Sequence, residues 1–182
     1  MLNDALDNGV PESEIREVIL TSYLFDGYPT ALEGFRVLHG ICSVNEMIKA
    51  PVEYLSENID LWRHRGEQLC RKVYGEQFEP LLNRISDFAP ELKDSMIIEG
   101  YGKVLSRPGL HIVYRELCVV SMLSLKFRLR QLRSHIIGAL RVGADVNQLE
   151  TAIGVASNFL LKEQILKCEN TLSVSVARHR MP

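Results

Sequence analysis

Apolar residues recur every three to four positions along most of the chain, which is the spacing of one face of an α-helix. Val113, Leu117 and Val120 form such a stripe, and a second stripe follows over residues 129–140. No segment shows the convincing alternation of apolar and polar residues that is typical of a β-strand. The pattern therefore predicts an all-α fold.

Glycine and proline residues divide this pattern into separate helices. Asp26-Gly27-Tyr28-Pro29 is predicted to break the first long stripe, because glycine permits a left-handed turn and proline cannot continue a helix. Gly75 and Gly143 are predicted to end two later helices, and Asp145 to cap the next. The predicted helical stretches are two within 8–41, then 59–74, 78–87, 90–104, two within 113–143, and two within 145–172.

One charged residue lies inside an apolar stripe. Glu116 falls among the apolar positions of its helix, where burying an unpaired carboxylate would be costly. On the next helix Arg128, Gln131 and His135 are spaced i, i+3 and i+7, which places them on one face. A short reversal near Lys126 would make the two helices antiparallel. We therefore expect the carboxylate of Glu116 to converge with this polar row.

The composition is that of an ordinary globular protein, with 182 residues, 46% of them hydrophobic, and a formal net charge of -2. This length suits one domain with a sizeable core. The near-neutral charge and the lack of a broad basic block argue against nucleic acid as the main partner. Arg128, Arg130 and Arg133 do form a local basic cluster, but such a cluster is more typical of a solvated helix face. No apolar stretch approaches the roughly 18 residues that span a bilayer, and the N-terminus does not resemble a signal peptide. We therefore expect no membrane partner and a cytoplasmic location.

The cysteines and histidines give no motif for a metal or a redox centre. The four cysteines contain no Cys-x-x-Cys, so a zinc ribbon or a dithiol has no local support, and they are expected to be reduced, mostly buried thiols. A disulfide between two of them stays open. The histidines form no helix-spaced pair, so no metal site is predicted.

The chain contains an internal repeat, since residues 5–38 match residues 139–172 at an offset of 134. The N-terminal copy keeps the Asp26-Gly27-Tyr28-Pro29 corner but begins too late to contain counterparts of Glu116 and His135. The C-terminal copy has Leu160-Leu161-Lys162-Glu163 at that corner. The N-terminal helices could complete their own repeat, pack against the C-terminal copy or cross to another subunit. The aligned positions are Ala5-Leu6 with Ala139-Leu140, Gly9 with Gly143, Ile15 with Leu149, Ile19 with Ile153, and Leu38 with Leu172.

Most of residues 61–160 consist of three segments, VYGEQFEPLL, GYGKVLSRPGLHIVYRELC and QLRSHIIGALRVGADVNQLETAI. With the N-terminal GVPESEIREVILTSYLFDGYPTAL, they resemble the carboxymuconolactone decarboxylase and alkylhydroperoxidase D family. The resemblance implies an all-helical fold that assembles as a homo-oligomer, such as a dimer, trimer or hexamer.

This resemblance also divides the chain into three parts. Residues 1–41 resemble the closing helix pair of the family repeat, and residues 42–60 form a connector in which Ser43 caps a short helix through Lys49. Residues 61–182 form the family domain and end in a short tail from Ser173.

The family's peroxidase branch carries a Glu, a Cys-x-x-Cys and a His at fixed spacing. Glu116 and His135 match the outer members, but Arg128 and Gln131 stand at the two cysteine positions. Because thiol peroxidase chemistry needs a thiolate there, the chain instead resembles the decarboxylase branch. The resemblance implies a cofactor-free decarboxylase acting on a carboxylated muconolactone or a similar small carboxylate or lactone.

Decarboxylation needs a cation to hold a carboxylate and a proton donor nearby. We expect His135 and Glu116 to be catalytic, with His135 transferring the proton and Glu116 orienting its imidazole. Arg128 and Gln131 are expected to bind the substrate, Arg128 through a carboxylate and Gln131 through a lactone oxygen. Two alternatives stay open. One is a noncatalytic oligomeric binding or scaffold protein, in which the Glu–His contact only joins two helices. The other is an atypical redox protein that uses Cys118 and Cys168.

Overall fold

The computed structural model describes residues 2–42 and 57–179, and every regular element within them is helical. The predicted all-α class is therefore confirmed. In chain order the elements are α1 (Leu2–Asp7), α2 (Glu12–Ile41), α3 (Ile59–Tyr74), the 3₁₀ turn η3 (Gly75–Gln77), α4 (Phe78–Phe88), α5 (Pro90–Ser95), the π-helical η4 (Met96–Leu105), α6 (Ile112–Leu125), α7 (Leu129–Val142), α8 (Val146–Ser157) and α9 (Lys162–His179).

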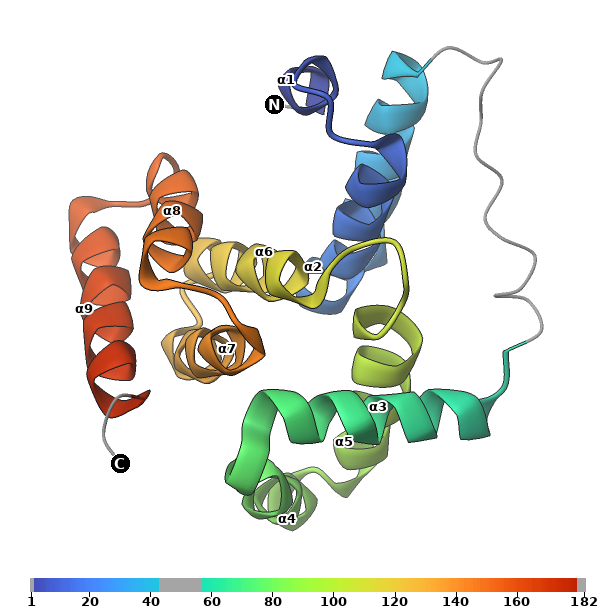
Figure 1. Ribbon diagram of the computed structural model, residues 1–182, viewed down its shortest axis with the longest axis vertical. Helices are drawn as coiled ribbons and strands as arrows, with labels where there is room; N and C mark the ends of the chain where they lie inside the picture. Colours follow the sequence, from blue (N-terminus) through green and yellow to red (C-terminus); the bar gives the residue numbers. More distant parts are fainter. Residues whose placement is uncertain (1, 43–56, 180–182) are drawn as a thin grey trace.

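Helix α6 lies at the centre of the molecule (Figure 1). Helices α7 and α8 pack against it, α9 packs against α7 and α8, and α2 packs against α6 on the other side. The main core forms where α3, α6 and α7 meet, because each contributes side chains that are completely buried, among them Val73, Val119, Val120, Leu132 and Ile136.

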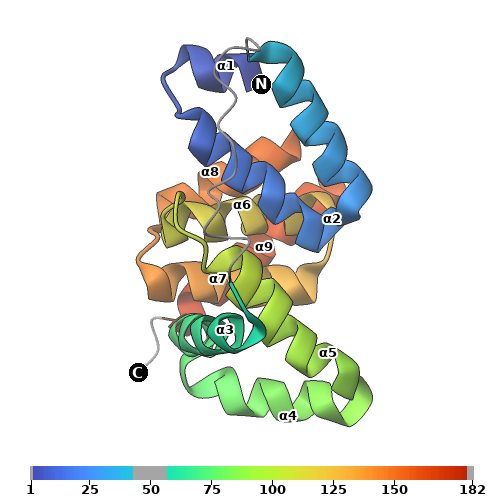
Figure 2. The same ribbon diagram turned by 90° about the vertical axis from the view of Figure 1, so that its right-hand side faces the viewer.

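Helix α2 is a hairpin of two helical arms. The backbone at Gly27 is left-handed, with φ 82° and ψ 171°, so the predicted break at this corner is confirmed. The two arms lie side by side (Figure 2), and a Cβ built on Gly34 would stand 2.9 Å from Cγ2 of Ile19. Ile15, Ile19 and Leu38 form a small core of their own between the arms.

Positions 134 residues apart have similar structural roles. Gly9 and Gly143 both have positive φ angles, of 80° and 110°. Both hairpins, the two arms of α2 and the pair α8–α9, bury the apolar residues that align in the repeat, namely Ile15 with Leu149, Ile19 with Ile153, and Leu38 with Leu172. The shared burial supports the internal repeat.

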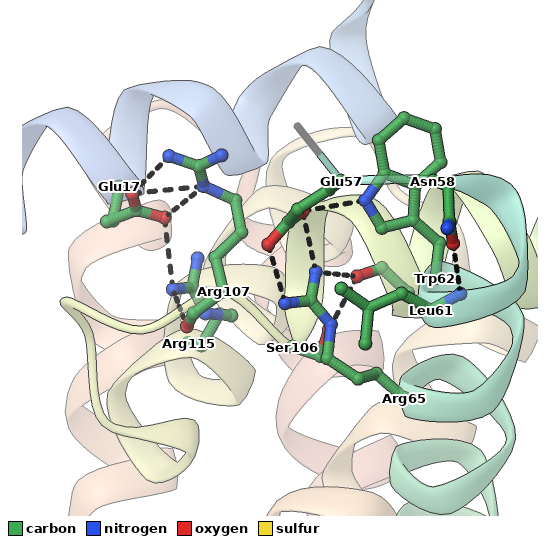
Figure 3. A network of polar contacts seen from close by, with 10 residues as sticks. Glu17, Glu57, Asn58, Leu61, Trp62, Arg65, Ser106, Arg107 and Arg115 are labelled. Atoms are coloured by element: carbon green, nitrogen blue, oxygen red, sulfur yellow. Dashed lines mark hydrogen bonds and ion pairs between the residues drawn. The ribbon is translucent and has the colours of Figure 1, made fainter. Parts of the chain in front are cut away.

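A buried ion network joins the N-terminal hairpin to α6 and to the loop before it (Figure 3). Glu17 of α2 accepts hydrogen bonds from Nε and Nη2 of Arg107, at 2.9 to 3.1 Å. It also accepts one from Nη2 of Arg115, at 3.1 Å, and Thr21 accepts another from Nη1 of Arg115. Arg115 is completely buried. This arginine therefore has a structural role, because it ties α6 to the N-terminal hairpin.

Two sequence predictions concern the segment after Ser173 and the segment from Ser43 to Lys49. The tail expected from Ser173 is wrong as far as His179, because α9 continues to that residue. Its last turns are held by contacts with the core, since Ser175 is buried and Val176 packs against the main cluster. The short helix expected from Ser43 to Lys49 lies outside the described residues.

Helices α3 and η4 cross at close backbone distance. A Cβ built on Gly66 of α3 would lie 2.1 Å from the carbonyl oxygen of Ile97, and one built on Gly102 of η4 would lie 2.0 Å from that of Trp62. Both distances are far below a van der Waals contact, so no side chain fits at either position.

Gly102→Ala should therefore force α3 and η4 apart and destabilise the fold by about 3 kcal/mol, measured by chemical denaturation. Gly100→Ala is the matched control in the same helix, because a Cβ there meets nothing within 4 Å. The control should be neutral or slightly stabilising. Equal effects of the two substitutions would contradict the close crossing.

Candidate functional site

The carboxylate of Glu116 and the imidazole of His135 meet in the core between α6 and α7. Nδ1 of His135 lies 2.9 Å from Oε2 of Glu116. A short reversal brings the helices together, in which Phe127 has a positive φ of 51° and the amide of Lys126 donates to the carbonyl of Met122. The expected convergence of the two side chains is confirmed. Their catalytic role stays a prediction.

The hydrogen bond sets the orientation of the imidazole. A carboxylate only accepts, so Nδ1 carries the proton and Nε2 is the ring nitrogen left for another partner. Glu116 is 1% exposed, whereas the His135 side chain is 9% exposed. The contact is therefore buried at its carboxylate end and reaches the surface only at the imidazole end.

The corner of the N-terminal hairpin lies over this imidazole. The ring of Phe25 contacts His135 edge-on, with centroids 5.8 Å apart and planes at 84°. The next residue, Asp26, forms an ion pair with Lys126 in the reversal between α6 and α7. The N-terminal helices therefore complete the surroundings of His135 within the same chain.

One oxygen of Glu116, Oε1, is buried and has no hydrogen-bond partner among the described residues. Its neighbourhood contains a thiol and two phenols from α3 and η4. Burial, followed by the negative charge of Glu116, raises the pKa of the Cys70 thiol. Burial also raises the pKa of Tyr101, with smaller contributions from Tyr74 and Glu116. The hydroxyl of Tyr101 donates to that of Tyr74 at 2.8 Å. Sequence patterning did not find these residues, because each belongs to an ordinary apolar stripe.

Because Gly138 has no side chain, α7 packs closely against α3 and still leaves room for the carboxylate of Glu116. A Cβ at this position in α7 would lie 2.6 Å from Cγ1 of Val73 and 3.4 Å from Oε2 of Glu116. Any larger residue would push α3 away from α7 or displace the carboxylate.

Arg128 and Gln131 lie at the surface rather than in contact with the buried pair. Gln131 is one helical turn before His135, so the two share a face of α7 as expected. Arg128 is the N-cap of α7, with φ −96° and ψ 67°, and so precedes the helix instead of lying on its face. The predicted row is wrong in this detail, because the chain reverses at Phe127 and the helix begins only at Leu129.

Tyr114, the four cysteines and possible metal ligands are the remaining polar candidates for a site. Tyr114 is 54% exposed. All four cysteines are free thiols. Within residues 2–42 and 57–179 no group of three His, Cys, Asp or Glu side chains is arranged to hold a metal ion. None of the helices described there is both long and apolar enough to cross a membrane.

Among the described residues, one surface cavity has a volume of about 510 Å³ and another has a volume of about 240 Å³. The larger lies between α3 and the start of α6, and the smaller between α3, α4 and the α5–η4 segment. Neither is lined by Glu116 or His135.

The chain matches no model of a known protein family, and no curated protein matches it significantly. The family suggested by the sequence segments therefore stays a prediction.

Replacing Glu116 with alanine should destabilise the protein by about 3 kcal/mol, because it leaves His135 buried without its partner. Glu163→Ala is the matched control, since it removes an exposed carboxylate paired with Lys167 one turn away. Chemical denaturation should detect no change for the control. A loss for Glu116→Ala as small as that of the control would show that the buried contact contributes nothing to stability.

The Cys118 thiol should react slowly in the folded protein. Burial raises its pKa to about 11, against a smaller opposing effect of Arg115. Near pH 8 only about one such thiol in a thousand is ionised, so alkylation should be about a hundredfold slower than in the unfolded chain. Iodoacetamide labelling followed by mass spectrometry measures both rates, and fast labelling of the folded protein would support the redox alternative.

Proposed function

We propose that the chain is a cofactor-free enzyme of the carboxymuconolactone decarboxylase type, which removes carbon dioxide from a small carboxylated lactone or a similar organic carboxylate. The observation that carries the proposal is the 2.9 Å contact between Glu116 and His135. It fixes the imidazole so that Nε2 is left for a proton transfer, and 9% of the His135 side chain remains exposed. We also propose that the helices adopt the fold of that family.

In the proposed reaction the bond between the substrate carbon and its carboxylate breaks, and carbon dioxide leaves. The electron pair remains on the substrate as an enolate-like system, and a proton from Nε2 of the His135 imidazolium neutralises it. Glu116 stabilises the imidazolium through Nδ1. Solvent then returns a proton to Nε2, so the enzyme is unchanged after each turnover.

Arg128 and Gln131 are proposed to bind the substrate at the surface end of this path. Neither side chain has a hydrogen-bond or ion-pair partner among the described residues, and both residues are exposed, so both can reach a ligand. The guanidinium of Arg128 would hold a carboxylate by two parallel hydrogen bonds, and the amide of Gln131 would donate to a lactone oxygen.

A homo-oligomer is proposed as the working form. Helices α8 and α9 and the loop between them expose large apolar side chains, among them Phe159, Leu161 and Leu166, each at least 64% exposed. Such exposure is typical of an interface with another protein chain.

The second candidate is a noncatalytic oligomeric binding or scaffold protein. The observation that favours it is that neither described cavity reaches Glu116 or His135. In this alternative the buried contact only joins α6 to α7.

The experiment is an assay of carbon dioxide release from carboxylated muconolactones. His135→Ala should lower kcat at least about 100-fold, because the proton donor is lost. Arg128→Ala should raise KM about tenfold through the lost carboxylate contact. Arg130→Ala is the control, since Arg130 is an exposed arginine on the same helix, and it should leave both constants unchanged.

Equal inactivity of the parent and both site variants would remove the support for a decarboxylase and favour the scaffold alternative. An active parent with an unaffected His135→Ala variant would show that the reaction does not use the proposed donor.

A further inference from the structure

The larger cavity, of about 510 Å³, lies outside the Glu116–His135 site. Its walls come from α3, from the end of η4 and from the loop that leads into α6. Its volume is in the range of pockets that bind small molecules. The polar side chains that line it are Arg65, Gln68, Lys72, Ser106, Arg107 and His111.

The charges on these walls are positive. Arg65, Lys72 and Arg107 line the cavity, and no aspartate or glutamate does. The two arginines form ion pairs with carboxylates that do not line the cavity, Arg65 with Glu57 and Arg107 with Glu17, and these pairs hold the guanidinium groups in place (Figure 3).

Lys72 differs from the two arginines, because it has no ion-pair partner among the described residues. Two further donors flank it. His111 accepts the amide of Val113 at its Nδ1, which leaves Nε2–H as a donor, and the first amides of α6 contribute a positive partial charge.

The smaller cavity differs from the larger one in the charge of its walls and in its volume. Its walls carry three cations and three carboxylates, so they are balanced, and its volume is less than half as large. The chain as a whole has a net charge of -2, so the cation-lined walls of the larger cavity do not follow from the overall composition. An anion is the ligand that this cavity favours.

Apolar side chains form the rest of the lining, so the walls also suit a hydrocarbon or aromatic body. These are Leu69, Leu105, Leu110 and Ile112.

We propose that this cavity is a binding site for a small organic carboxylate with an apolar body, in which Lys72 pairs with the carboxylate and the leucine and isoleucine side chains contact the body. The site does not depend on the proposed function, because it shares no residue with Glu116, His135, Arg128 or Gln131. One of its lining residues, Ile112, is one helical turn before Glu116 on α6.

The test is a titration of the full chain with benzoate, followed by amide chemical shifts in two-dimensional NMR. Benzoate should shift the amides of Lys72, Leu110 and Ile112, and leave those of Lys93 and Ile97 at the smaller cavity unchanged. Benzamide, which has the same body without the charge, should produce no such shifts. Inorganic phosphate, an anion without an apolar body, should bind more weakly than benzoate.

Lys72→Met keeps the length and apolar stem of the side chain but removes its charge, and should weaken benzoate binding about fivefold. Lys72→Arg should restore it. Lys93→Met at the smaller cavity is the matched control and should bind like the parent, as should His135→Ala, which separates this site from the proposed catalytic pair.

Four results would overturn the proposal: no shifts with benzoate, equal shifts with benzamide, phosphate binding as tight as benzoate binding, or unweakened binding by Lys72→Met. Loss of benzoate binding in His135→Ala would also overturn it, because the ligand would then occupy the other site.

Discussion

Two consecutive buried charges on α6 determine how the helices pack around it. Arg115 and Glu116 are each at most 1% exposed, and each needs a partner, because an unpaired charge in the core is costly. Adjacent residues on a helix point about 100° apart, so the partners come from different helices. Glu17 of α2 pairs with Arg115, and His135 of α7 pairs with Glu116. The position of the N-terminal hairpin and the position of α7 are thus both set by one dipeptide.

Local chemistry explains which features of the fold could be predicted from the sequence. The break at Gly27, the helix end at Gly143 and the cap at Asp145 depend on residues within a few positions, and all three are present. The pairing of Arg115 with Glu17 joins residues 98 positions apart, so no local pattern contains it. The continuation of α9 beyond Ser173 was also missed, because its last turns are stabilised by contact with distant core residues rather than by their own periodicity.

The candidate site shows the same division. Glu116 and His135 could be paired from the sequence, since a charge in an apolar stripe requires a partner and only a short reversal separates the helices. The place of Arg128 could not, because the helical spacing was extended one residue beyond the start of α7, to an N-cap residue with a non-helical backbone. The cation-lined cavity was missed for another reason. Its walls combine α3 with the loop before α6. Lys72 becomes part of a cavity only where it lies together with residues such as His111, which is far away in the chain.

The N-terminal hairpin contacts Arg115 of α6 and also His135, the partner of Glu116. Its first arm carries Glu17, which binds Arg115, and its corner carries Phe25 and Asp26, which contact His135 and Lys126. Moving the corner away from His135 would require the ion pair of Asp26 to break, while the Glu17 network holds the beginning of the same arm, which precedes Gly27. Because the arm is held by several charge-assisted hydrogen bonds and the corner by one partly exposed ion pair, the corner is the weaker attachment.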